Sequence, residues 1–262
     1  MEDQRGMRFR QLFLALFITA LTTLGVCAAP KHVLVPMDDG TALATDIHLP
    51  RGHGPWPVIL LRSTYGRRGG GVEQFNRRGY AVVVQDVRGM GDSEGDKHVF
   101  HADGWRPDKH DGADTVDWIH NQHWCDGNVG TTGGSALGIT QMMLAPATDR
   151  VAAQFIQVAP ANFYTEGIYH GGVWRKNLGE GWLEAIQQPH VADIWKGHPY
   201  YDAYWQYMNV TAQAPDITAP ALFVGGWYDI FQQGTLDAFV SRQERGGPGA
   251  RGNNRLVMKW SA

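Results

Sequence analysis

The sequence predicts an α/β fold, a mostly parallel sheet with helices on both faces. The chain has 262 residues, of which 43% are hydrophobic and 19% are charged, so it can bury a large core. From residue 33 onward, short β-branched runs alternate with helix-like segments, an order typical of parallel strands joined by crossover helices. Several of the runs are apolar throughout, as strands covered on both faces must be.

The predicted elements begin with an antiparallel pair of strands. Residues 33–35 and 43–49 flank the dipeptide Asp39-Gly40, which favours a tight turn. The further predicted strands are 58–61, 80–86, 128–133, 153–158, 221–225 and 255–260, and the predicted helices between them are 72–78, 111–122 and 136–145. We therefore assign residues 33–161 and 216–262 to the α/β domain.

Residues 162–215 interrupt this alternation. Eleven aromatic residues fall within residues 162–208, and we predict that the segment is a helical cap inserted over the sheet. Aromatic side chains suit both a small hydrophobic core and the wall of a substrate pocket. The sequence leaves both interpretations open.

The N-terminus has the pattern of a secretory signal peptide. Three arginines precede the uncharged run 12–26, and small residues follow, with cleavage expected after Ala28. A membrane anchor is the alternative, but a spanning helix needs about 20 apolar residues. We therefore expect residues 1–28 to be removed and the mature protein to be secreted or periplasmic, with no stable membrane association.

The charge balance argues against nucleic acid as a partner. Lys and Arg number 23, Asp and Glu 26, and the formal net charge is −3, whereas nucleic-acid-binding domains normally present a basic face. We predict no cofactor, and a small molecule as the ligand. The sequence does not determine the oligomeric state.

A literal G-x-S-x-G motif occurs at Ser93, within Gly91-Asp92-Ser93-Glu94-Gly95. A nucleophile elbow needs a strand before the serine and a helix after it. The residues after Ser93 do not begin a helix, and two acidic neighbours would oppose an oxyanion. We predict that Ser93 is not a nucleophile.

Ser135 has the required context. A strand enters through Gly133-Gly134, and a helix leaves from Ala136. Small residues let the backbone turn sharply, and the Ala136 amide would donate a hydrogen bond to an oxyanion. The alternative is a glycine-rich turn with an idle serine.

Two further residues fit a serine hydrolase site. Tyr65 lies in the loop after the strand 58–61 and would supply the second oxyanion donor through its phenol. Asp229 follows the strand 221–225, at the edge where sites of open α/β sheets form. It also follows the serine in the order Ser, Asp, His. Asp237, eight residues later, is a poorer candidate.

With these residues, the chain resembles the cocaine esterase / X-prolyl dipeptidyl-peptidase family of serine acyl hydrolases. The resemblance covers residues 33–262 and is carried by segments 37–46, 62–66, 86–95, 117–119, 124–130, the Ser135 elbow and 226–229. It implies an α/β-hydrolase fold, with Ser135 as nucleophile, Asp229 as triad acid, and Tyr65 with the Ala136 amide as oxyanion donors.

Three features depart from that family. Ala136 stands where a tyrosine is usual after the nucleophile. Phe231 and Gln232 follow Asp229, where members acting on α-amino acid esters carry acidic residues. The family's C-terminal jelly-roll domain would begin after residue 262.

No histidine follows Asp229 in the sequence, although the fold places the triad histidine there. In the resembled family it comes two residues after the tryptophan that corresponds to Trp260. We therefore expect a truncated hydrolase, incomplete at its C-terminus and nearly inactive. His170 is the upstream histidine best placed to substitute.

The predicted function is cleavage of ester or amide bonds, including X-Pro dipeptidyl bonds, through an acyl-enzyme on Ser135. One alternative is a catalytically silent scaffold that binds a ligand. The other is a metal-dependent hydrolase that uses the His/Asp-rich stretch 98–111, although its spacing matches no closed metal site and we expect no metal.

Overall fold

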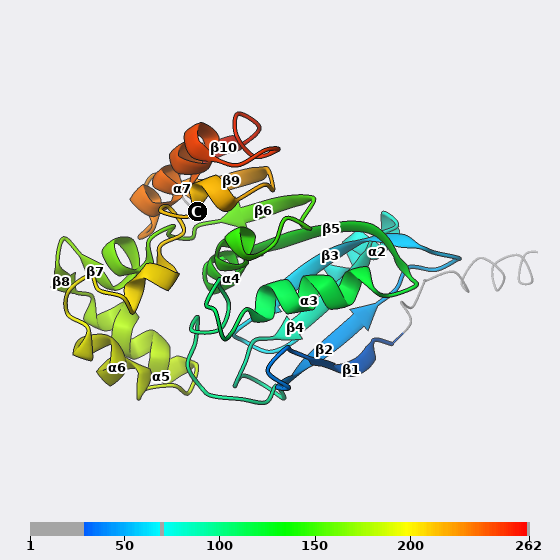
Figure 1. Ribbon diagram of the computed structural model, residues 1–262, viewed down its shortest axis with the longest axis horizontal. Coiled ribbons are helices and arrows are strands. Elements are labelled where there is room, and N and C mark those ends of the chain that lie inside the picture. The colour runs from blue at the N-terminus through cyan, green and yellow to red at the C-terminus, as the bar shows by residue number, and fades with distance from the viewer. Residues whose placement is uncertain (1–28, 69–70, 261–262) are drawn as a thin grey trace, which may run out of the picture.

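The computed structural model describes residues 29–68 and 71–260, and within them it confirms the predicted α/β fold (Figure 1). One eight-stranded sheet has the order β1-β2-β4-β3-β5-β6-β9-β10. Its strands are β1 (Lys31–Pro36), β2 (Ala42–His48), β3 (Trp56–Ser63), β4 (Ala81–Asp86), β5 (Cys125–Gly134), β6 (Ala153–Gln157), β9 (Ala221–Gly226) and β10 (Arg255–Lys259).

The strand directions set the location of the site. Strand β2 pairs antiparallel with both β1 and β4, and the remaining neighbours pair in parallel. The carboxyl ends of β3, β4, β5, β6, β9 and β10 therefore lie along one edge of the sheet, where ligands bind in open α/β folds.

Helices cover both faces of the sheet, as predicted. Leu60 and Val83 pack in the cluster that includes α3, whereas their neighbours Leu61 and Val82 pack with Phe75 of α2, because successive side chains of a strand point to opposite faces. The main helices are α2 (Val72–Arg77), α3 (Asp111–His120), α4 (Ala136–Leu144) and α7 (Gln232–Arg245). On the α2 face, a groove of about 1000 Å³ lies open along β3, β5, β6 and β9.

Residues 163–208 leave the sheet and form the segment that we call the cap (Figure 1). Its helices are short, and a small hairpin accompanies them, so it is less regular than the predicted helical insertion. It contains the π-helices Phe163–Ile168 and Asn177–Trp182, the hairpin β7 (Tyr169–His170) and β8 (Val173–Trp174), α5 (Leu183–Ala185), α6 (Val191–Gly197) and the 3-10 turn Trp205–Met208. Further 3-10 turns span Ala145–Ala147 and Ala214–Asp216.

The cap aromatics mainly form a core of their own. Phe163, Trp195 and Trp205 are buried, and the ring centroids of Phe163 and Trp195 lie 5.3 Å apart, edge to face. The sequence left open whether the aromatic residues form a core or a pocket wall. The rings that are buried most deeply belong to the core of the cap. Trp182 is an exception, because its indole bonds to Tyr65 in the loop after β3.

The predicted signal peptide, residues 1–28, lies outside the described residues. Among the residues that are described, none belongs to a helix with the length and apolar character needed to cross a bilayer.

Candidate active site

Ser135 occupies a sharp turn between β5 and α4. Its backbone has φ 54° and ψ −124°, a strained conformation for a residue with a side chain. The turn is held from both sides: the Ser135 amide donates to the Gln157 carbonyl at 3.0 Å, and the Ser135 carbonyl accepts from the amides of Gly138 and Ile139. The Ser135 side chain is exposed. This is the strand–turn–helix geometry of a nucleophile elbow.

Two glycines of the elbow are required by close packing. A Cβ on Gly138 would lie 2.7 Å from the Ala159 Cβ and 3.0 Å from the Gln157 carbonyl oxygen. Gly133 has φ +156°, and a Cβ there would lie 2.6 Å from the Leu137 Cβ. The absence of these side chains lets α4 approach β5 at Gly133 and β6 at Gly138.

We expect Gly138→Ala to lower the free energy of unfolding by about 1–3 kcal/mol, the usual cost of overpacking. The matched control is Gly181→Ala in the cap, where an added Cβ meets open space and alanine favours the helix. Urea denaturation measures both. Equal stability of the two variants would show that the elbow can relax around the methyl group.

Ser93 has a structural role instead. Its hydroxyl donates to the Asp86 carbonyl at 2.7 Å and accepts from the Ala44 amide at 2.9 Å. It thus ties the loop after β4 to β2. No helix follows Ser93, so its motif lacks the elbow geometry.

Tyr65 lies just beyond β3 with about half of its surface exposed. The indole Nε1 of Trp182 donates to its hydroxyl oxygen at 2.9 Å, and the Tyr65 amide donates to the Ser63 hydroxyl at 3.0 Å. Because the phenol accepts from the cap, its own proton stays available for donation. Trp182 was not singled out from the sequence; its partner is 117 residues away.

Asp229 lies in the turn after β9. Its Oδ1 accepts from the Phe231 amide at 2.7 Å, while no described residue bonds its Oδ2. The Trp227 amide donates to the Lys259 carbonyl at 3.0 Å, and Lys259 pairs with Gly226 in the parallel register of β10 and β9. The end of β10 therefore lies beside the turn that carries Asp229.

No histidine among the described residues makes a hydrogen bond to Ser135 or Asp229. His170, the predicted substitute, belongs to the cap hairpin and is exposed. The structure thus presents the predicted nucleophile and acid at one edge of the sheet without a bonded base.

The His/Asp-rich stretch 98–111 does not converge on a metal site. Asp103 pairs with Arg62 at 2.5 Å, and Asp111 pairs with Arg88 at 2.6 Å. Both acids are buried, so these ion pairs stabilise the loop rather than leaving the carboxylates free for a cation.

Two of the three histidines of that stretch, His98 and His101, are packed against aromatic rings. The rings of His98 and His101 stack with centroids 4.2 Å apart, and His98 Nε2 lies 2.8 Å from the Tyr204 hydroxyl. Burial lowers the pKa of His98 to about 3 and the pKa of His101 to about 4. They join the loop to the cap as neutral rings.

Within residues 29–68 and 71–260, the group with metal-ligand spacing is Asp38, His110 and Asp114. It shares only His110 with the predicted stretch, and His110 Nδ1 already pairs with Asp114 at 2.6 Å. The predicted metal alternative therefore gains no support from this arrangement.

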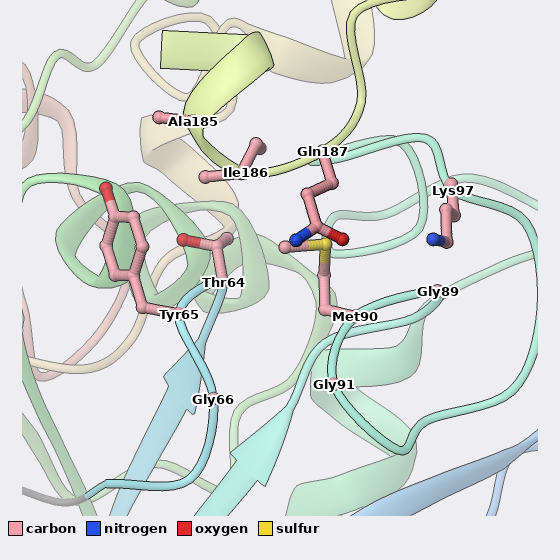
Figure 2. Close-up of a pocket in the computed structure, with 10 residues that line it drawn as sticks. All are labelled: Thr64, Tyr65, Gly66, Gly89, Met90, Gly91, Lys97, Ala185, Ile186 and Gln187. Atoms are coloured by element: carbon pink, nitrogen blue, oxygen red, sulfur yellow. The ribbon is translucent and has the colours of Figure 1, made fainter.

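A cavity of about 380 Å³ separates the cap from the loops after β3 and β4 (Figure 2). Tyr65 lines it from the sheet side, and residues 185–187 line it from the cap. Lys97, in the loop after β4, and Gln187, in the cap, also line it. Neither could be predicted from the sequence, because only the fold brings the cap next to the loop after β4.

Known proteins are similar to this chain in sequence and in fold. The family model described as X-Pro dipeptidyl-peptidase (S15 family) matches residues 39–190 and 183–261. Cocaine esterase from Rhodococcus sp. (strain MB1 Bresler) is 31% identical in an alignment that covers 90% of this chain and 49% of the esterase. The chain thus spans about half the length of that relative.

Solved structures give the same fold. A CocE/NonD family hydrolase from Staphylococcus aureus matches with a TM-score of 0.72 at 21% identity, covering 88% of this chain and 45% of its own. An α-amino acid ester hydrolase matches with a TM-score of 0.69 at 22% identity, covering 92% of this chain and 50% of its own. The fold is the α/β-hydrolase fold, and the chain belongs to the X-Pro dipeptidyl-peptidase (S15) family.

Proposed function

We propose that the protein is a serine hydrolase that cleaves ester or amide bonds through an acyl-enzyme on Ser135. The observation that carries this proposal is the strained elbow, which exposes the Ser135 hydroxyl at the carboxyl edge of the sheet beside the first turn of α4. A strained turn persists where the surrounding structure holds it in place, and such turns cluster at active sites.

In the proposed reaction, Ser135 Oγ attacks the substrate carbonyl carbon while a base removes its proton. The Ala136 amide and the Tyr65 phenol then donate hydrogen bonds to the oxyanion. The leaving group departs with a proton from the base, and water releases the acyl group by the reverse sequence. In this proposal the base is a histidine oriented by Asp229, which the α/β-hydrolase fold usually places after the last strand of the sheet.

The names of the relatives suggest both ester and X-Pro dipeptidyl substrates, and the triad chemistry serves either bond. A panel of 4-nitrophenyl esters and X-Pro anilides, offered to the complete product of the gene, tests the proposal. Hydrolysis of at least one member, with Ser135-dependent turnover, is expected. Activity that survives Ser135→Ala but disappears with a chelator would favour metal-dependent hydrolysis.

We expect Tyr65→Phe to lower turnover about 10²–10³-fold, because one oxyanion donor contributes roughly 3–4 kcal/mol to lowering the barrier. Folding should change little, since the phenol is half exposed. Steady-state kinetics and thermal unfolding measure the two effects. A rise in KM alone, at unchanged kcat, would show that the phenol positions substrate instead.

A further inference from the structure

The cavity between the cap and the sheet has the size of a small-molecule subsite. Its volume is about 380 Å³, within the usual range for ligand pockets. Three separate segments line it: residues 64–66 after β3, residues 89–91 and 97 after β4, and the cap turn 185–187 (Figure 2). Tyr65 also lines it, so a molecule bound there lies beside the residue that we propose as an oxyanion donor.

Among the described residues that line this cavity, Lys97 alone is charged. Its side chain is exposed and has no ion pair with a described residue, since the adjacent Asp96 pairs with Lys109 at 3.5 Å. Its ammonium group is therefore free to bind an anion that enters the cavity.

The backbone of Lys97 is fixed from two directions. Gly89 has φ +68°, and a Cβ there would lie 2.8 Å from the Lys97 Cα, so only glycine permits this close approach. From the cap, His190 Nε2 lies 2.7 Å from the Lys97 carbonyl oxygen. These contacts hold the lysine at the rim, opposite Tyr65 (Figure 2).

Gln187 is held in a left-handed conformation with φ 60°, which costs a residue with a Cβ roughly 1–2 kcal/mol. Its neighbour Gln188 imposes the turn: it is fully buried, accepts from the Val99 amide at 2.8 Å, and donates its own amide to the Leu183 carbonyl. The Gln187 side chain has no described hydrogen-bond partner and points from the cap toward Met90 (Figure 2).

Thr64 adds an unsatisfied polar group. Its hydroxyl is buried and has no hydrogen-bond partner among the described residues, although the residue lines the cavity. A buried hydroxyl without a partner is costly; because it is closed to solvent, a ligand in the cavity would reach it only after the side chain rotates.

We propose that this cavity is a subsite for a carboxylate-bearing part of the substrate, with Lys97 pairing with the carboxylate and Gln187 orienting it by hydrogen bonding. Binding of a carboxylate in this cavity does not depend on the proposed function. Only the later hydrolysis of the bound molecule rests on it. Substrates with an ammonium group are disfavoured, because no acidic residue of the described part of the chain lines the cavity and Lys97 would repel the charge.

Binding is measured by calorimetry in the Ser135→Ala variant, so that catalysis plays no part. The probes are monomethyl glutarate, an anion, and dimethyl glutarate, its neutral counterpart. We expect the anion to bind about tenfold more tightly. No binding of the anion, or equal binding of the two probes, would overturn the proposal whether or not the enzyme hydrolyses esters.

Variants separate Lys97 from the general charge of the protein. Lys97→Met should reduce binding of the anion to that of the neutral probe, and Lys97→Arg should retain the preference. The control Lys176→Met makes the same charge change on an exposed residue outside the cavity, and we expect it to leave binding unchanged. An equal loss in both methionine variants would contradict a specific subsite.

Gln187→Gly tests the strained residue without threatening the fold. Glycine adopts φ 60° readily, so stability should stay equal or rise while binding of the anion weakens severalfold. Unchanged binding in this variant would remove Gln187 from the subsite.

Discussion

Replacing Ser135 by alanine is expected to lower turnover of the complete gene product by about 10⁶, the typical cost of losing a triad serine. The loss is large because Ser135 Oγ forms the covalent bond, and no neighbouring group can replace it at the elbow. The measurement is the rate of ester hydrolysis at saturating substrate, together with thermal unfolding to show that the variant folds.

Ser93→Ala is the matched control, because Ser93 lies in the literal G-x-S-x-G motif. It should lose the two hydrogen bonds to Asp86 and Ala44 and therefore some stability, on the order of 1–2 kcal/mol. Its turnover should remain close to that of the unaltered protein. Normal turnover in Ser135→Ala, or a comparable collapse in Ser93→Ala, would reverse the assignment of the nucleophile.

The chain of 262 residues, expressed as given, is expected to hydrolyse esters poorly or not at all. Among the described residues no histidine bonds to Ser135 or Asp229. A serine hydroxyl that lacks a base stays protonated and is a weak nucleophile, and loss of a triad histidine costs about as much as loss of the serine. The measurement is the hydrolysis of a 4-nitrophenyl ester by this chain beside its Ser135→Ala variant.

Robust hydrolysis by the 262-residue chain, abolished by Ser135→Ala, would show that another residue acts as base. His170→Ala would then identify or exclude the cap histidine. A complete gene product that shows no hydrolysis and no reaction with a fluorophosphonate would instead favour a silent scaffold.

The sheet could be predicted from the sequence because its signals are local. Strands β3 and β4 are apolar runs bounded by polar turns, and the alternation of strands and helices implies parallel pairing. The errors lie mainly at the ends: β5 begins at Cys125, before the predicted residue 128, and β10 ends at Lys259. In the cap, the hairpin and the π-helices have no comparable periodic signal.

The elbow could be predicted for the same reason. Small residues around Ser135 and the helix that follows it are neighbours in the sequence. The contact of Trp182 with Tyr65 joins residues 117 positions apart, and the cavity brings Lys97 to Gln187 through the fold. No local sequence pattern predicts such contacts. Tyr65 could therefore be predicted from the sequence as a site residue, but its partner Trp182 could not.

Labelling with a fluorophosphonate tests the central claim most directly, because the reagent bonds covalently to an activated serine. In the complete gene product, trypsin separates the two rival serines: residues 89–97 contain Ser93 as their only serine, and residues 110–150 contain Ser135 as theirs. We expect mass spectrometry to find the adduct on peptide 110–150, at Ser135, with loss of activity in proportion to labelling. An adduct on peptide 89–97, or an active enzyme that is inhibited with Ser135 unlabelled, would contradict the account.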